Sequence, residues 1–151
     1  MPDQLDYNKL RSVSLFRDLD KKEIEVVYKR IFEQSVKKDS ILFMEGTPGE
    51  FLYVIMSGKV EIIKKTKNNE EMVLATMGAN EIIGEMSLID AEPRTATART
   101  SEDSVLVVIT KQKFNEILQS DPRIAAKILM GLLKVINKRL RIMDKKLEGI
   151  N

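Results

Sequence analysis

The first third of the chain carries apolar residues at helical spacing. Between Ile24 and Ile31 they recur three or four positions apart, which is typical of the buried face of a helix. Asp20 can cap this helix, with Glu23 at the third helical position as in a capping box. The pattern predicts helices within residues 8–34, with their apolar side chains packed in the core.

From residue 36 to residue 109 the pattern changes to short runs of apolar and β-branched residues. These runs cover residues 40–44, 51–56, 59–65, 71–76, 95–99 and 104–109. Turn residues separate them, at 46–49, 57–58, 68–69 and 77–80. Many short strands at even spacing are typical of an antiparallel roll or jelly-roll barrel. We therefore expect a mostly β fold with flanking helices.

Two helices are predicted at the C-terminal end. Thr110 can cap the first, over residues 111–119, and Asp121-Pro122 can begin the second. The second helix carries a heptad seam, which consists of Leu129, Leu133, Ile136, Leu140, Met143 and Leu147. Such a seam predicts a parallel homodimer through residues 125–147. The alternative is an amphipathic helix that lies on its own β-roll.

Length and composition fit one domain and narrow the chemistry. The 151 residues are 43% hydrophobic and 32% charged, with a formal net charge of +2, which is too small to indicate nucleic-acid binding. Histidine and cysteine are both absent, so the commonest metal ligands and the commonest general base are missing. The sequence has no apolar run long enough to span a bilayer and no signal-peptide pattern, so we expect a cytoplasmic protein.

The stretch from Gly84 to Thr100 carries the candidate chemistry. Gly84 permits close backbone approach to a ligand, and free N–H groups at the start of a short helix attract anions. Arg94 offers a planar fork that matches a phosphate, and Glu85 offers acceptors for a sugar hydroxyl. These features predict a site for a phosphorylated sugar. The alternative is a plain salt bridge between Glu85 and Arg94 across a surface loop.

The same stretch resembles a known family, and the resemblance extends along nearly the whole chain. Its matching segments are Gly84-Glu85, Leu88, Pro93-Arg94, Ala96-Thr97, 15–19, 41–43, 46–49, 52–55 and 57–60. Taken in their order along the chain, these segments are similar to the cyclic nucleotide-binding domains. That family includes the bacterial catabolite activator protein and the regulatory subunits of cyclic-AMP-dependent kinase. The resemblance implies a β-roll and a phosphate-binding cassette at 84–97.

The resemblance also implies roles for particular residues. Arg94 would contact the cyclic phosphate, and Glu85 would accept from the ribose 2′-hydroxyl. The cassette residues expected to bind the ligand are Gly84, Glu85, Met86, Ser87, Arg94, Thr95 and Ala96, with backbone N–H groups near Ser87 and Ala96 completing the phosphate cradle. Apolar strand positions would line the base pocket, namely Ile62, Leu74 and Ala75. The final helix would supply a residue that caps the base, and three candidates stay open: Asn137, Lys138 and Arg139.

The predicted function is a cyclic nucleotide sensor that signals through its last helix. Its ligand would be cyclic AMP, since the apolar base pocket offers nothing to the guanine amine, or else cyclic GMP, whose amine the Thr95 hydroxyl could bind. We expect no enzyme activity, no metal and no cofactor. The alternatives are a ligand-free β-roll for dimerisation or docking and a sensor fragment of a larger regulator or channel. The effector is unknown, and since no helix-turn-helix follows the last helix, we do not expect this chain to bind nucleic acid.

Overall fold

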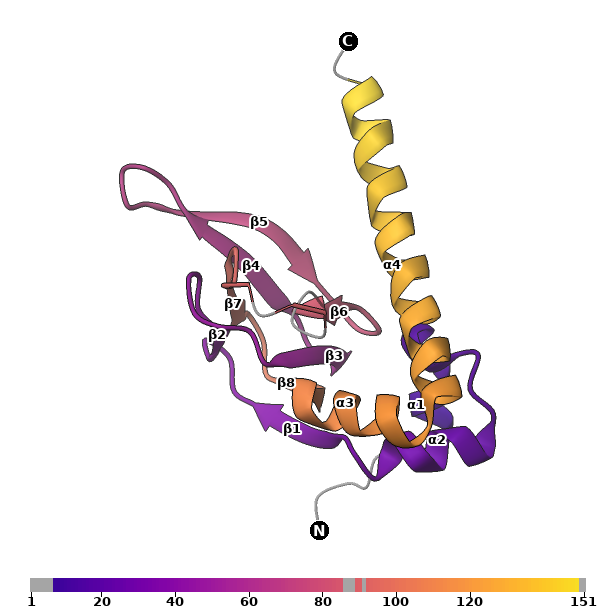
Figure 1. Cartoon of the computed structure of the whole chain (residues 1–151). Coiled ribbons are helices and arrows are strands. Elements are labelled where there is room, and N and C mark those ends of the chain that lie inside the picture. The colour runs from indigo at the N-terminus through magenta and orange to yellow at the C-terminus, as the bar shows by residue number, and fades with distance from the viewer. Residues whose placement is uncertain (1–6, 86–88, 91, 150–151) are drawn as a thin grey trace.

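The computed structural model describes residues 7–85, 89–90 and 92–149. In chain order its elements are α1 (Tyr7–Ser12), the 3₁₀ helix η1 (Ser14–Phe16), α2 (Lys21–Tyr28), β1 (Phe32–Val36), β2 (Ile41–Phe43), β3 (Phe51–Ser57), β4 (Val60–Lys65), β5 (Glu71–Met77), β6 (Ile82–Ile83), β7 (Thr97–Thr100), β8 (Ser104–Thr110), α3 (Lys111–Ser120) and α4 (Pro122–Glu148). The strands form a β-roll, as predicted, with helices on one side and α4 extending away from it (Figure 1).

Two four-stranded antiparallel sheets make the roll. Their strand orders are β1-β8-β3-β6 and β2-β7-β4-β5. In the first sheet β3 and β8 are buried on both faces, which explains their unbroken apolar runs. Leu52 and Val54 of β3 face the core shared with the helices, whereas Tyr53 and Ile55 face the core between the sheets. The first sheet therefore separates a helical core from an inner core.

The N-terminal helical region is shorter than predicted and has three parts. Helix α2 ends at Tyr28, and Phe32–Val36 forms strand β1 instead of the end of a helix. Phe32 pairs with Val108 and Val36 with Ser104. The edge of the first sheet supplies these hydrogen bonds, so tertiary pairing overrides any local helical preference.

The predicted helix caps differ in outcome. The capping box of α2 is present, with Glu23 N donating to Asp20 Oδ1 at 2.9 Å and Asp20 N donating to Glu23 Oε1 at 3.0 Å. Lys113 N donates to Thr110 Oγ1 at 3.0 Å, which confirms the cap of α3. Pro122 does begin α4, but the Asp121 side chain makes no capping bond.

Helix α4 packs on its own domain through its N-terminal half, and the seam residues Leu129 and Ile136 are partly buried against the same core. Its buried residues are Ile124, Ala125, Ile128, Gly131 and Leu132. A Cβ on Gly131 would lie 2.7 Å from the Leu15 carbonyl oxygen, so the glycine allows η1 to approach closely. The seam residues Leu133, Leu140, Met143 and Leu147 are each more than half exposed. The β-roll of the same chain therefore leaves the C-terminal part of the seam uncovered.

Candidate functional site

A cavity of about 520 Å³ lies where the cassette segment, the second sheet and α4 meet. Its lining residues come from β2, β4, β5, β6, the segment after β6, the segment before β7, and α4. They are Phe43, Ile62, Met77, Ile82, Ile83, Gly84, Glu85, Asp90, Glu92, Pro93, Arg94, Thr95, Ala96 and Arg139. The wall is mostly apolar, with charged groups on one side, which is the usual construction of a small-molecule site.

Arg94 is the buried cation of this cavity, with only 8% of its surface exposed. Its Nη2 donates to the Phe51 carbonyl at 2.7 Å and its Nη1 to the Gly84 carbonyl at 3.3 Å. The guanidinium carbon lies 4.1 Å from the centre of the Phe43 ring, a cation–π distance. Main-chain acceptors and an aromatic face therefore hold the arginine in place.

The charge of Arg94 has no carboxylate partner among the described residues. Its Nε is buried and has no hydrogen-bond acceptor. Burial lowers the pKa of the guanidinium, while nearby Tyr53 and Glu85 act in the opposite direction. An arginine stays protonated even so, and a buried cation without an anion is costly. The arrangement is that of a site prepared for an anion.

The position of Gly84 explains why the cassette begins with glycine. Its φ is +75°, in the left-handed region. A Cβ there would lie 2.7 Å from Arg94 Nη1 and 3.0 Å from the Phe51 carbonyl oxygen. Any other residue would be strained and would also push against the arginine.

Glu85 pairs with α4 rather than with Arg94. Arg139 Nη1 donates to Glu85 Oε1 at 2.5 Å, and Arg139 Nη2 makes a short hydrogen bond to the Ile82 carbonyl. Both groups are partly buried. The alternative of a plain Glu85–Arg94 salt bridge is therefore not what forms. The ion pair instead joins the final helix to the cassette.

Most of the predicted cassette residues meet at this one cavity. Gly84, Glu85, Arg94, Thr95 and Ala96 all line it. Met86 and Ser87 fall outside the described residues. The stretch thus brings together the glycine, the carboxylate and the guanidinium that the sequence pattern singled out.

One of the three positions predicted to line the base pocket does so, and the other two do not. Ile62 lines the cavity, but Leu74 and Ala75 do not, and both are exposed on β5. For Leu74 the reason is a shift in register, since Ile62 pairs with Ala75 while Ile63 pairs with Val73. This leaves Leu74 as the extra residue of a bulge, which changes the direction of the strand.

Among the three base-cap candidates, Arg139 alone lines the cavity. Asn137 and Lys138 are exposed. Lys138 instead borders a smaller cavity of about 280 Å³ between η1 and α4.

Sequence reasoning missed several lining residues. Phe43 and Met77 end their strands at the cavity, and Ile82 and Ile83 make up the short strand β6. The acidic tip of the cassette, Asp90 and Glu92, also reaches the lining. The one available signal was the proximity of Asp90 and Glu92 to Arg94 in the sequence. The other four depend on how the strands cross.

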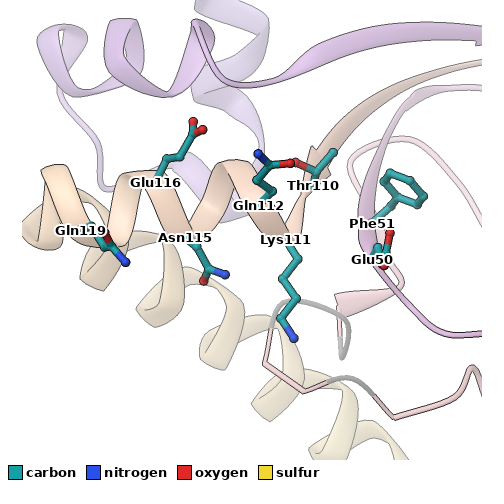
Figure 2. Close-up of a pocket in the computed structure, with 8 residues that line it drawn as sticks. All are labelled: Glu50, Phe51, Thr110, Lys111, Gln112, Asn115, Glu116 and Gln119. Atoms are coloured by element: carbon teal, nitrogen blue, oxygen red, sulfur yellow. The ribbon is translucent and has the colours of Figure 1, made fainter.

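A second cavity, of about 600 Å³, lies beside α3 (Figure 2). Side chains of Lys111, Asn115 and Gln119 border it along the helix, with Glu50 and Phe51 at one end. None of the described buried side-chain atoms without a hydrogen-bond partner belongs to its lining. It therefore lacks the anion-seeking group found at Arg94, although the carbonyl of Phe51 serves that arginine.

The described residues contain no group of three histidine, cysteine, aspartate or glutamate side chains that could hold a metal ion. No helix within the described part of the chain is both long and apolar enough to cross a membrane.

Known proteins resemble this chain in sequence and in fold. The CRP-like cAMP-activated global transcriptional regulator of Mycobacterium tuberculosis is 29% identical over 141 residues, which make up 93% of this chain and 61% of that protein. The chain thus spans about three-fifths of that relative's length. The co-crystal structure of the regulatory domain of Toxoplasma gondii PKA with cAMP is 31% identical, with a TM-score of 0.66 over 74% of this chain and 42% of that chain.

The crystal structure of a cyclic nucleotide-binding domain from Methylobacillus flagellatus has a TM-score of 0.87 and 27% identity, covering 96% of this chain and 84% of that chain. Residues 33–121 match the family model of the cyclic nucleotide-binding domain. This match covers more than half of the chain and confirms the resemblance inferred from the cassette. The chain belongs to the cyclic nucleotide-binding domain family.

Proposed function

We propose that this chain is a sensor domain that binds a 3′,5′-cyclic nucleotide, cyclic AMP in particular, in the 520 Å³ cavity. The observation that carries the proposal is Arg94, a buried guanidinium with no carboxylate partner among the described residues. The cyclic phosphate supplies the missing anion. Two relatives support this choice of ligand, since cAMP appears in the names of the M. tuberculosis regulator and of the T. gondii co-crystal structure.

The other groups at the cavity fit the remaining parts of the ligand. Glu85 accepts from the ribose 2′-hydroxyl with the carboxylate acceptors that Arg139 leaves free. Thr95 and Ala96 follow Arg94 in the cavity lining and lie at the phosphate. Ile62, Phe43 and Met77 give the base an apolar wall.

Arg139 is our choice for the residue that faces the base. It lies on the cavity wall and is held by Glu85 and by the Ile82 carbonyl. Its planar guanidinium can stack on a purine. A ligand that engages Glu85 shares this carboxylate with Arg139, and this is the route by which nucleotide binding is passed to α4.

Cyclic AMP is the preferred ligand, because the side chains of Ile62, Ile83 and Met77 offer no hydrogen-bond partner to the amine of guanine. Thr95 is the one hydroxyl side chain in the described lining, and cyclic GMP is the second choice on that account. A buried amine without a partner would weaken cyclic GMP binding.

Isothermal calorimetry with cyclic AMP, cyclic GMP and 2′-deoxy cyclic AMP tests the proposal. Arg94→Ala should weaken cyclic AMP binding at least about tenfold, because a hydrogen bond to a charged group contributes about 1.5–3 kcal/mol. Arg123→Ala removes an exposed arginine of α4 and should change nothing. The 2′-deoxy ligand should bind more weakly than cyclic AMP, since Glu85 loses its partner. Equal affinity of wild type and Arg94→Ala for cyclic AMP would overturn the assignment.

We further propose that two copies associate through residues 125–147 and that this cytoplasmic dimer passes the signal to an effector. The uncovered seam residues Leu133, Leu140, Met143 and Leu147 support the association. The effector is either a separate protein or another domain. A ligand-free docking domain would show the same seam, but it would not need the unpaired buried arginine.

A further inference from the structure

We propose that Asp90 and Glu92 form an electrostatic filter that admits singly charged cyclic nucleotides and excludes linear nucleoside 5′-phosphates. The two carboxylates lie at the acidic tip of the cassette and line the same cavity as Arg94. None of the roles at phosphate, ribose or base accounts for them. The inference rests on the proposed function, because it concerns how that same site selects its ligand.

The charges around the cavity point to a monoanion. The described lining holds three carboxylates, on Glu85, Asp90 and Glu92, and two guanidinium groups, on Arg94 and Arg139, so its net formal charge is −1. Glu85 and Arg139 neutralise each other at 2.5 Å. This leaves one cation, Arg94, in the same lining as the acidic pair.

The burial of Arg94 supports an anion at this position. Arg94 is more than nine-tenths buried, and its Nε has no acceptor among the described residues. One guanidinium without a counter-ion balances one negative charge. A second negative charge on the ligand would find no cation left and would face Asp90 and Glu92.

The exposure of the acidic pair suits repulsion of a ligand that enters the cavity from solvent. Asp90 is half-buried and Glu92 is exposed, and neither side chain forms a salt bridge in the described part of the chain. Asp90 Oδ1 accepts from the Glu92 backbone N–H at 3.2 Å, which holds the two residues together. Their charges are therefore not cancelled before a ligand arrives.

The ligand chemistry provides the discrimination. A cyclic phosphodiester carries one negative charge at all pH values of interest. A terminal phosphate loses its second proton near pH 6 and carries about two charges above it. Cyclic AMP and 5′-AMP share the same base and ribose, so the ratio of their affinities isolates the response to phosphate charge and ring closure.

Competition binding of cyclic AMP and 5′-AMP to the double variant Asp90→Asn/Glu92→Gln tests the filter. Asparagine and glutamine keep the size and the Asp90 acceptor but remove both charges. Because the interaction scales with ligand charge, 5′-AMP should gain about the square of the factor that cyclic AMP gains, on the order of tenfold against threefold at neutral pH. Glu25→Gln/Glu148→Gln changes the net charge equally at two exposed, distant positions and should leave both affinities unchanged, because salt screens remote charges.

A pH series gives a second readout. As the pH falls from 7.5 to about 5, 5′-AMP gains a proton, so wild type should bind it more tightly while cyclic AMP binding stays level. The double variant should show a smaller rise. Equal gains for both nucleotides in the variant, or the same pH response in variant and wild type, would overturn the filter and leave the proposed function intact. Failure of wild type to bind cyclic AMP would overturn both.

Discussion

At the scale of single residues, the site is organised by how Arg94 is held. Two main-chain carbonyls and the Phe43 ring fix the guanidinium, and Gly84 makes room for it. A buried arginine normally takes a carboxylate, which would compete with an anionic ligand. Neutral acceptors orient the group and leave its charge available.

Gly84→Ala is predicted to damage the fold and the site together. Alanine at φ +75° costs about 1–2 kcal/mol of stability, and its Cβ would press on Arg94 Nη1 from 2.7 Å. We expect lower unfolding stability in urea and weaker cyclic AMP binding by calorimetry.

Gly58→Ala is the matched control for this prediction. Gly58 has φ +96°, and a Cβ there would press on Ser104 and on the Asp103 carbonyl, neither of which belongs to the described lining of the cavity. It should lose at least as much stability and keep its affinity for cyclic AMP. Equal loss of affinity in the two variants would mean that backbone strain, not contact with Arg94, is responsible.

The sequence was informative for residues whose chemistry is local. Gly84, Glu85 and Arg94 lie within eleven positions of one another, and their types, together with the family resemblance, predicted an anion site. Arg139 was indistinguishable from its neighbours because its direction depends on how α4 packs against η1 at Gly131. Leu74 was misplaced because a bulge is not visible in a strand pattern.

At the scale of elements, the cap of α2 is a local sequence feature whose carboxylate, on Asp20, also titrates. The pKa of Asp20 lies below its ordinary value of 3.8, chiefly because the backbone N–H of Glu23 donates to the carboxylate. The folded state therefore holds this proton less tightly than the unfolded state. The contribution to stability is present above about pH 3.8 and is lost as the pH falls through the folded pKa.

Asp20→Asn should flatten this part of the pH dependence. Asparagine keeps an acceptor for the cap but does not titrate. The difference in free energy of unfolding between wild type and variant, measured with urea, should be constant near neutrality. Below about pH 4 wild type should lose stability relative to the variant. Asp20→Ser, a second non-titrating cap, should behave alike. Variants that lose stability with acid as steeply as wild type would contradict the assignment.

Strand β1 shows why a short sequence window cannot predict every element. Phe32–Val36 follows an amphipathic helix closely and lacks a turn signal such as glycine or proline. Its conformation is decided by five register partners on β8, at Ser104 to Val108. These partners are about seventy residues away in sequence, so no short window contains the information.

At the scale of the whole molecule, α4 has two functions on two faces. Its buried face, from Ile124 to Leu132, closes the helical core, and its partners there include Lys127–Glu23 at 2.7 Å. Further along, Arg139 contacts the cassette. Of the seam, Leu129 and Ile136 also pack partly against this core, whereas Leu133, Leu140, Met143 and Leu147 remain open toward solvent.

Leu140→Glu is predicted to weaken self-association. Leu140 is 55% exposed in the protomer, and burying a leucine contributes about 1.5–3 kcal/mol, twice over in a symmetric dimer. Sedimentation equilibrium should show a dimer for wild type and at least about tenfold weaker association for the variant.

Ile142→Glu provides the comparison, since Ile142 is 47% exposed but lies off the seam. It should associate like wild type. A wild type that remains monomeric at high concentration, with and without cyclic AMP, would show that the seam has another partner.

The main-chain carbonyls that hold Arg94 also affect which amino-acid substitutions this pocket can accept during evolution. An amide oxygen belongs to every amino acid, so replacement of Phe51 changes a side chain but leaves its acceptor in place. Few substitutions can therefore misdirect the arginine, and those few are concentrated at Gly84 and Phe43. The rest of the apolar wall and the acidic tip can then vary around a fixed anchor. A domain of this construction can change which base or which ligand charge it accepts without changing the contacts that orient its phosphate-binding arginine.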